Sequence, residues 1–263
     1  MRALVAGLVP NAVKRAIDRR RTARFLARVG PATHEHVRRH GLEVRRSPLA
    51  GLRYLPQLAA TSGDLVAKLV GTYELELHAA LERWIASAPA TIVDVGSAEG
   101  TYAVGLALAI PSTRVVAFDV DPAARALCAA MAELNGVADR VDVRAECTHE
   151  LLNGLAAAGL AIFLDCEGCE LVLLRPDLVP ALRRTPIIVE LHDFVDASIS
   201  QTIAERFAPT HDVRIVQGTA RDPATVPELA GLDTTTAAAL LSEFRPGAMR
   251  WGVLTPRGPA SVS

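Results

Sequence analysis

Residues 91–101 read TIVDVGSAEGT, and this stretch decides the fold. The first five residues are mostly apolar and β-branched, which is typical of a buried strand, and the small residues after them indicate a turn into a helix. In open α/β sheets, ligands bind outside the carboxyl ends of the strands, where this turn would lie. Gly96 permits a sharp turn and a close approach of a ligand to the backbone, and Gly100 lets the helix begin close to the sheet. The stretch therefore predicts a ligand site.

Working outward from this stretch, short β-branched runs alternate with longer Ala/Leu-rich runs, the pattern of a parallel sheet covered by helices. Proline and glycine residues interrupt the segment 218–247, so the strand after it can enter antiparallel. We predict an α/β fold with a doubly wound, mostly parallel, seven-stranded Rossmann-like sheet and an antiparallel last strand. The predicted strands are 91–95, 114–119, 140–146, 160–165, 186–192, 212–217 and 249–255. The predicted helices are 75–85, 101–109, 122–135, 148–157, 170–184, 197–207 and 234–243.

The composition places the chain among globular proteins. Of its 263 residues 50% are hydrophobic, 22% are charged and 4% are aromatic, which argues against a disordered chain and against nucleic-acid binding through aromatic stacking. The net charge of −1 is unevenly distributed, because residues 1–53 carry 13 Lys/Arg and three acidic residues, a charge of +10. The remainder of the chain therefore carries −11.

The charge distribution suggests a basic helical N-terminal arm at residues 1–60, a main domain at 61–256 and a tail at 257–263. Apolar positions such as Phe25 and Val29 between the arginines are compatible with amphipathic helices. The arm either packs on the body or on a second copy in a homo-oligomer, which we favour, or it contacts an anionic partner or a membrane surface. No transmembrane segment is expected, because no run of about 18 apolar residues is free of charges and helix breakers.

The four cysteines, Cys128, Cys147, Cys166 and Cys169, are too few and too clustered for the disulfide framework of a small secreted protein. Pro10 interrupts the apolar opening MRALVAGLVP and no cleavage site follows, so a signal peptide is not expected. We therefore expect a reducing, cytoplasmic location. The C-x-x-C at 166–169 has no second pair, and neither a zinc site nor a redox function is predicted from it.

The turn after the first strand departs from the dinucleotide fingerprint G-x-G-x-x-G, because Ala98 stands between the glycines at 96 and 100. A pyrophosphate cradle is therefore disfavoured. Asp119 ends the second predicted strand, where a carboxylate can accept hydrogen bonds from both hydroxyls of a ribose. Its alternative role as a helix cap is better filled by Asp121 before Pro122. A ribose acid without a phosphate cradle points to a nucleoside cofactor that lacks phosphates, of which S-adenosylmethionine is the common one.

Several stretches resemble class I S-adenosylmethionine-dependent methyltransferases and, within them, the FkbM family. The resemblance covers about residues 68–192 and extends more loosely to 256. Ala98, Val120 and Phe163 differ from the residues usual in the family, so the substrate class does not transfer. The stretches are LVGTYELEL (69–77), IVDVGSAEGTYAVGLA (92–107), VVAFDVDPAARALCAAMAELNGV (115–137), IFLDCEGCELVLL (162–174) and PIIVELHD (186–193).

The resemblance implies a set of cofactor-binding residues. The turn would hold the methionine part, Asp119 the ribose, and residues after the second and third strands the adenine. Asp165 would face the methionine ammonium or the reaction centre, and the segment before the sheet would close over the site. The residues so implied are Tyr73, Glu74, Asp94, Gly96, Ser97, Thr101, Tyr102, Asp119, Val120, Glu146 and Asp165.

Methyl transfer to a hydroxyl benefits from a base that removes the proton, and candidates gather at the ends of the fourth and fifth strands. We predict His192 as the general base, oriented by Asp193 or Glu190, because the pKa of histidine lies near neutrality. Asp165 and Glu190 complete the predicted catalytic set. The alternative is that His192 is only a polar residue at a strand end.

Three other functions stay open. An acid after the fourth strand and His192-Asp193 after the fifth resemble metal-dependent O-methyltransferases, whose divalent cation, such as magnesium, binds the acceptor hydroxyl. No motif of dedicated spacing supports metal ligands, so none are predicted. A nicotinamide-dependent oxidoreductase shares the fold, and an inert binding or scaffold protein would use the basic arm. The favoured substrate is a small molecule, a sugar or a specialised metabolite methylated on oxygen, and its identity cannot be read from the chain.

Overall fold

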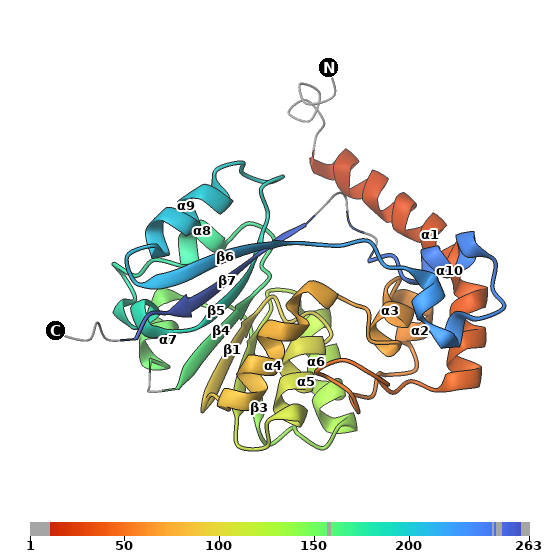
Figure 1. Ribbon diagram of the computed structural model, residues 1–263, viewed down its shortest axis with the longest axis horizontal. Helices are drawn as coiled ribbons and strands as arrows, with labels where there is room; N and C mark the ends of the chain where they lie inside the picture. The colour runs from red at the N-terminus through yellow and green to blue at the C-terminus, as the bar shows by residue number, and fades with distance from the viewer. Residues whose placement is uncertain (1–10, 157–158, 244, 246–248, 259–263) are drawn as a thin grey trace. The chain divides into compact units, whose positions relative to one another are not determined.

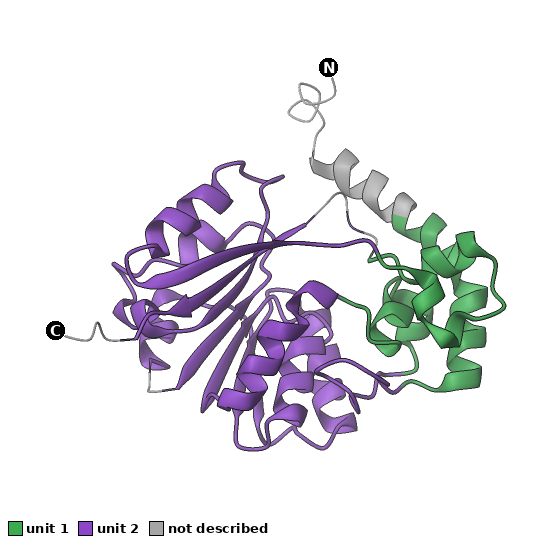
Figure 2. Cartoon of the chain, in the orientation of Figure 1, with its two compact units in different colours: residues 1–42, 56–73, 221–244 green, residues 43–55, 74–220, 245–263 purple. Residues whose placement is uncertain are grey.

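A computed structural model describes residues 11–156, 159–243, 245 and 249–258, with the side chains of 11–21 left out. The chain divides into two compact units: unit 1 comprises residues 1–42, 56–73 and 221–244, and unit 2 comprises residues 43–55, 74–220 and 245–263 (Figure 2). Among the described residues, no helix has the length and apolar character needed to span a membrane. The division into an arm of 1–60 and a domain of 61–256 stays a prediction.

Unit 2 is built on one seven-stranded sheet with the order β3-β2-β1-β4-β5-β7-β6 (Figure 1). β1 to β5 pair in parallel where they are neighbours, and β7 lies antiparallel between β5 and β6. The predicted mostly parallel sheet with an antiparallel last strand is therefore confirmed. The strands are β1 Thr91–Val95, β2 Arg114–Phe118, β3 Val141–Arg144, β4 Leu160–Leu164, β5 Ile187–Leu191, β6 His211–Gln217 and β7 Arg250–Pro256.

Register aligns the carboxyl ends of the central strands. In β1, Val95 pairs with Phe118 of β2 on one side and with Leu164 of β4 on the other. The residues that follow these strands therefore leave the sheet at the same edge, which is where ligands bind in open α/β sheets. This alignment brings together motifs that are up to about 70 residues apart in the chain.

Helices cover both faces of the sheet, with α4, α5 and α6 on one face and α7, α8 and α9 on the other (Figure 1). Caps set several of their starts: Asp121 accepts a hydrogen bond from Ala123 N before α6, and Thr148 accepts one from Leu151 N before α7. These helices are α4 His78–Ser87, which follows the 3-10 turn η1 Leu75–Leu77, α5 Thr101–Ala109, α6 Pro122–Leu134, α7 His149–Gly154, α8 Glu170–Leu173 and α9 Ile199–Phe207.

The continuous helix predicted over 170–184 is wrong. α8 ends at Leu173, and the chain forms a separate 3-10 turn, η2 Pro180–Arg184. Pro176 and Pro180 account for the break, because proline lacks the amide proton that a helix interior requires. The short helix leaves Glu170 on its first turn, directly behind the end of β4.

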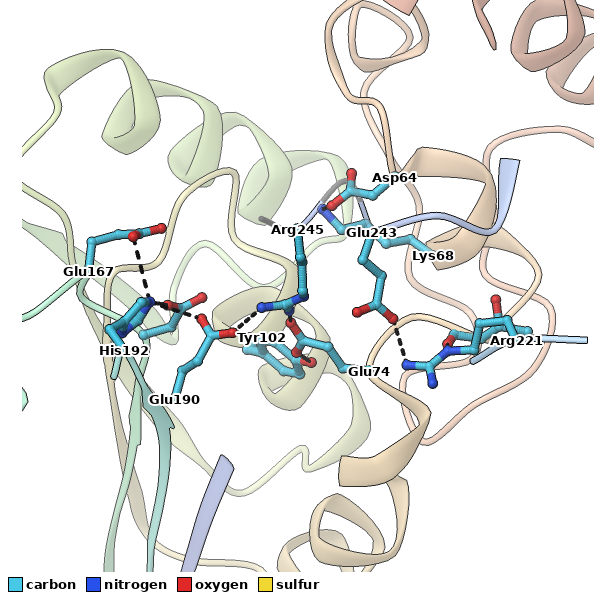
Figure 3. Close-up of polar contacts among 12 residues, drawn as sticks. Asp64, Lys68, Glu74, Tyr102, Glu167, Glu190, His192, Arg221, Glu243 and Arg245 are labelled. Carbon is cyan, nitrogen blue, oxygen red and sulfur yellow. Dashed lines mark hydrogen bonds and ion pairs between the residues drawn. The ribbon is translucent and has the colours of Figure 1, made fainter. Parts of the chain in front are cut away.

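Unit 1 is a helical unit made from three parts of the chain. Its core joins Phe25 and Val29 of α1 to Val66 and Val70 near α3 and to a third group that includes Leu240 of α10. The salt bridges Lys68 Nζ–Asp64 Oδ2 (3.0 Å) and Arg221 Nη2–Glu243 Oε1 (2.6 Å) lie within it (Figure 3). Its elements are α1 Asn11–His40, α2 Leu58–Thr61, α3 Leu65–Leu69, the 3-10 turns η3 Pro223–Thr225 and η4 Pro227–Leu229, and α10 Thr234–Leu240.

Candidate active site

The turn after β1 makes an unusually close backbone contact. Gly96 has a φ of +86°, and a Cβ built on it would lie 1.7 Å from the carbonyl oxygen of Asp165, the residue after β4. No side chain fits there, so glycine is required both by conformation and by space. Gly100, with a φ of +96°, begins α5 against Cys128, where an added Cβ would lie 3.0 Å from the Cys128 sulfur. Gly96 thus forms the predicted sharp turn, Gly100 packs against α6 and not against the sheet, and the approach of a ligand to Gly96 stays a prediction.

Asp119 follows β2 and faces the same turn. Its Oδ2 accepts a hydrogen bond from Ala98 N at 2.9 Å, and its Oδ1 accepts one from Asp121 N at 2.9 Å. Each carboxylate oxygen has more than one lone pair, so further acceptor capacity is left on both oxygens. The backbone amides thereby orient the carboxylate, and Asp121 performs the helix-capping role instead.

These residues border one cavity of about 440 Å³ at the carboxyl ends of β1 to β4. Five of the predicted cofactor residues, Gly96, Asp119, Val120, Glu146 and Asp165, line this cavity. The rest of its wall is mostly apolar and includes a cysteine pair. The other lining residues are Val95, Ala98, Phe118, Ala145, Cys147, Cys166, Glu167, Cys169, Val172 and Leu173.

The remaining predicted cofactor residues lie elsewhere. Asp94 and Ser97 are buried and do not line the cavity, and Thr101 Oγ1 forms a hydrogen bond with the Tyr54 hydroxyl at 3.0 Å. Tyr73 belongs to unit 1, where Lys68 Nζ lies 4.7 Å from the centre of its ring. The cofactor roles of these residues stay predictions.

Glu74, Tyr102 and the partly buried Arg245 form one group of polar contacts. The Tyr102 hydroxyl donates to one carboxylate oxygen of Glu74, and Arg245 pairs with the other oxygen and also with Glu190 of β5 (Figure 3). Glu74 is completely buried, and burial, together with the charge of Asp165, raises the pKa of Glu74 to about 8 although Arg245 opposes this. Burial likewise raises the pKa of Glu190 to about 7. Arg245 therefore contacts two carboxyl groups that stay protonated until the pH reaches about 7 to 8.

His192 lies at the end of β5 among four carboxyl groups. Its Nδ1 is hydrogen bonded to Oε1 of the fully buried Glu170, so Glu170 is the residue that orients the ring. Its Nε2 lies 3.2 Å from Glu190 Oε2 and 3.4 Å from Asp165 Oδ1. Asp193, predicted as a possible orienting partner, instead accepts hydrogen bonds from the amide and hydroxyl of Ser200.

The acids around His192 determine its charge. Burial disfavours the imidazolium, but the surrounding carboxyl groups of Asp165, Glu170 and Glu190 outweigh burial and raise the pKa of His192 to about 12. The same contacts lower the pKa of Asp165 despite its burial. In this arrangement the ring is protonated at neutral pH, and a protonated ring cannot accept a proton from a substrate.

Cys166 and Cys169 form a disulfide in the loop between β4 and α8, and both line the cavity. This bond differs from the reduced cysteines expected from the sequence. The two residues between them, Glu167 and Gly168, have φ values of +54° and +114°. The loop thus places Asp165 on one side of the disulfide and Glu170 on the other.

Two contributors to the site were not assigned these roles from the sequence. Arg245 is an isolated arginine in the Pro/Gly-rich segment before β7, and its partner Glu74 lies 171 residues away, so no local pattern signals the contact. Glu170 was visible as an acid at a helix start, and its pairing with His192 depends on the β4–β5 register.

Comparisons with known proteins give only distant similarity. No protein-family model matches the chain, and no curated protein matches it. Among solved structures, the O-methyltransferase TomG from Streptomyces achromogenes, in complex with S-adenosylmethionine, aligns over 86% of this chain and 89% of its own with 14% identity and a TM-score of 0.45. A putative O-methyltransferase from Klebsiella pneumoniae aligns over 97% and 95% with 16% identity and a TM-score of 0.43. A methyltransferase from Geobacter sulfurreducens aligns over 96% and 94% with 16% identity and a TM-score of 0.42. Similarity at this level does not assign a function to this chain.

Proposed function

We propose that the chain is an S-adenosylmethionine-dependent methyltransferase of the FkbM type, acting in the cytoplasm on a hydroxyl of a small molecule such as a sugar or a specialised metabolite. One observation carries the proposal: the predicted turn glycine Gly96, ribose acid Asp119 and strand-end acid Asp165 line one cavity although they come from three strands. The resemblance of the motifs around these residues supplies the family and the reaction.

The cavity suits the proposed cofactor in size and chemistry. Its volume of about 440 Å³ lies in the range of small-molecule sites, and its wall is mainly apolar with a few acids. Gly96 lets the turn after β1 lie against the Asp165 carbonyl at the edge of the cavity, and the Asp119 carboxylate is held by two amides with lone pairs to spare. Asp119 and Glu146 would hold the ribose and the adenine edge, and Asp165 the ammonium group.

S-adenosylmethionine supplies an electrophilic methyl group when bound. The protein then has to align the acceptor oxygen and exclude water, and such alignment lowers a barrier by about 7–11 kcal/mol. We place the acceptor beside Asp165, Glu190 and His192. The role of His192 as general base requires its neutral form, so the negative charge around it must first be neutralised by something other than the ring proton.

Isothermal titration calorimetry tests the cofactor assignment. We expect micromolar binding of S-adenosylmethionine by the wild type and about 10- to 100-fold weaker binding by Asp119→Ala, because two charge-assisted hydrogen bonds are lost. Asp142→Ala, a half-exposed acid on β3, is the matched control and is expected to bind normally. Absence of binding by the wild type, or equal binding by Asp119→Ala, contradicts the proposal.

Further measurements separate the alternatives. Tighter binding of a nicotinamide cofactor than of S-adenosylmethionine supports the oxidoreductase, and methyl transfer to any hydroxyl compound in a screen excludes an inert scaffold. We expect His192→Ala to reduce turnover about 100-fold or more while cofactor affinity changes little. Loss of cofactor affinity in His192→Ala would instead assign the ring a structural role.

A further inference from the structure

Three side chains at the ends of β4 and β5 converge on one point. Asp165, Glu190 and His192 each offer a ligand atom, and these atoms all lie within 4.8 Å of one another. Two of the separations, His192 Nε2 to Glu190 Oε2 at 3.2 Å and to Asp165 Oδ1 at 3.4 Å, are informative. Ligand atoms about 2.1 Å from one ion at tetrahedral or octahedral angles are about 3.0–3.4 Å apart. The cluster therefore has the spacing of atoms that share a cation.

The ring of His192 is oriented for ligation. Glu170, fully buried, binds Nδ1, which leaves Nε2 as the nitrogen that faces Asp165 and Glu190 (Figure 3 shows His192 and Glu190). His192 is 1% exposed, and its Nε2 makes no hydrogen bond to any described residue. A carboxylate on one ring nitrogen and a metal on the other is the common arrangement of histidine ligands, because the carboxylate fixes the tautomer and the ring orientation. This unpartnered buried nitrogen is the observation that points to a ligand.

The charges of the cluster also favour a cation. Glu190 presents Oε1 to Arg245 and Oε2 to His192, so the two oxygens have separate partners. Asp165 Oδ1 is buried and has no hydrogen-bond partner among the residues that the structure describes. A buried carboxylate oxygen without a partner is costly, and a divalent ion between Asp165 and His192 removes that cost.

We propose that Asp165, Glu190 and His192 bind a divalent first-row transition-metal ion. The ion takes the place of the proton on His192 Nε2, and this proton is released to solvent on binding. One imidazole nitrogen with two carboxylate oxygens suits Mn²⁺, Fe²⁺ or Zn²⁺ better than Mg²⁺, which prefers oxygen ligands alone. Three protein ligands leave coordination positions open, and Asp165 lines the cavity, so these positions are available to a substrate oxygen. The use of the ion to bind and acidify the acceptor hydroxyl rests on the proposed function, whereas the binding of the ion does not.

Titration of chelator-treated, full-length protein with Mn²⁺, followed by electron paramagnetic resonance of the free ion, tests the site. Mn²⁺ is the probe because it suits a set of one imidazole nitrogen and two carboxylate oxygens, and because the free ion is paramagnetic. We expect one ion per chain, about 100-fold weaker binding in Asp165→Asn and His192→Ala, and about 10- to 100-fold weaker binding in Glu170→Gln, which loses the orienting carboxylate.

Glu167→Gln is the matched control. Glu167 Oε2 lies 3.6 Å from His192 Nε2, and its side chain is 78% exposed, so the substitution removes the same charge from the same loop without removing a proposed ligand. We expect Mn²⁺ binding within about threefold of the wild type. An equal loss in Glu167→Gln and Asp165→Asn would reduce the effect to general electrostatics and overturn the proposal.

Two further outcomes are decisive. No binding of Mn²⁺ by the wild type at millimolar concentration, or displacement of Mn²⁺ by an equal concentration of Mg²⁺, overturns the assignment of the His192 nitrogen as a ligand. If His192→Ala does not fold, the isosteric Asp165→Asn keeps the test open.

Asp119→Ala is expected to lose S-adenosylmethionine binding and keep Mn²⁺ binding. Mn²⁺ binding without S-adenosylmethionine binding in the wild type would refute the proposed function alone. S-adenosylmethionine binding without Mn²⁺ binding would refute the metal site alone.

Discussion

Gly96, the residue after β1, lies against the backbone carbonyl of Asp165, the residue after β4, and a single added carbon tests that contact. We expect Gly96→Ala to lower the free energy of unfolding by about 3 kcal/mol, because the Cβ lies 1.7 Å from the Asp165 carbonyl oxygen and the φ of +86° is unfavourable for alanine. The strand ends must separate to relieve the overlap, so cofactor binding is lost as well. Urea unfolding and calorimetry measure the two effects.

Gly136→Ala separates the backbone cost from the steric cost. Gly136 has a φ of +67° after α6, but a Cβ there has no atom within 4 Å. We expect Gly136→Ala to lower the free energy of unfolding by only about 1 kcal/mol, because alanine disfavours the left-handed conformation. Equal losses in the two variants would mean that the approach of Gly96 to Asp165 is not a tight contact.

Asp94 gives a pH dependence of stability. Burial, with a smaller contribution from the charge of Asp165, raises the pKa of Asp94 to about 8 in the folded chain. Between the ordinary pKa near 4 and this value, the folded state binds more protons than the unfolded state, so stability falls as pH rises. We expect Asp94 to contribute a slope of about −1.4 kcal/mol per pH unit between pH 5 and pH 7.

Urea unfolding at pH 5, 6, 7 and 8 measures this slope. We expect Asp94→Asn to remove the contribution, because the amide does not titrate, and the exposed control Asp139→Asn to leave it in place. The assignment fails if Asp94→Asn and Asp139→Asn show the same dependence as the wild type.

At the scale of elements, the arginine before β7 joins β5 to the turn before α4. Arg245 pairs with Glu190 and Glu74, which are 2% and 0% exposed. We expect Arg245→Ala to destabilise the fold by about 3 kcal/mol at pH 9, because the two buried carboxyl groups must then either be ionised without a cation or take up protons at high pH. At pH 5 both carboxyl groups are protonated, since their pKa values of about 7 and 8 rise further without the arginine. The substitution therefore lowers the free energy of unfolding only slightly at this pH.

Arg250→Ala provides the control for this prediction. Arg250 is the first residue of β7, and its guanidinium lies 2.7 Å from Asp193 Oδ2 with a side chain that is 40% exposed. We expect Arg250→Ala to lower the free energy of unfolding by less than about 1 kcal/mol, with little dependence on pH, as for other half-exposed ion pairs. Thermal unfolding at pH 5 and pH 9 compares both variants, and a loss in Arg245→Ala that does not grow with pH contradicts the prediction.

The strands and helices also show which parts of the fold and the site could be predicted from the sequence. All seven strands were predictable because β-branched runs and small-residue turns mark them, and Gly96, Asp119 and Asp165 followed as residues at aligned strand ends. The prediction failed where proline ended α8 early. The pairings of Glu170 and Arg245 were out of reach, because they depend on which strands become neighbours and not on any local pattern.

For the whole molecule, helix α1 of the predicted basic arm packs into unit 1. Phe25 of α1 is 8% exposed and belongs to a core with α3 and α10. We expect Phe25→Ala to destabilise unit 1 by about 3 kcal/mol and to raise hydrogen exchange in 226–241 while exchange in the sheet is unchanged. Arg24→Gln, an exposed neighbour, is expected to change stability by less than about 0.5 kcal/mol. A larger effect of Arg24→Gln than of Phe25→Ala would favour a role for the arm in charge interactions alone.

The discontinuity of unit 1 has a consequence during synthesis of the chain. Phe25 leaves the ribosome about 200 residues before the core residues between 226 and 241. The apolar side of α1 therefore stays unpacked during most of translation. β6 also stays unpaired until late, because its partner in the sheet is β7, which follows it in the chain. The five parallel strands that carry Gly96, Asp119 and Asp165 can pair much earlier. The cofactor cavity is therefore expected to form on the nascent chain before unit 1 is complete.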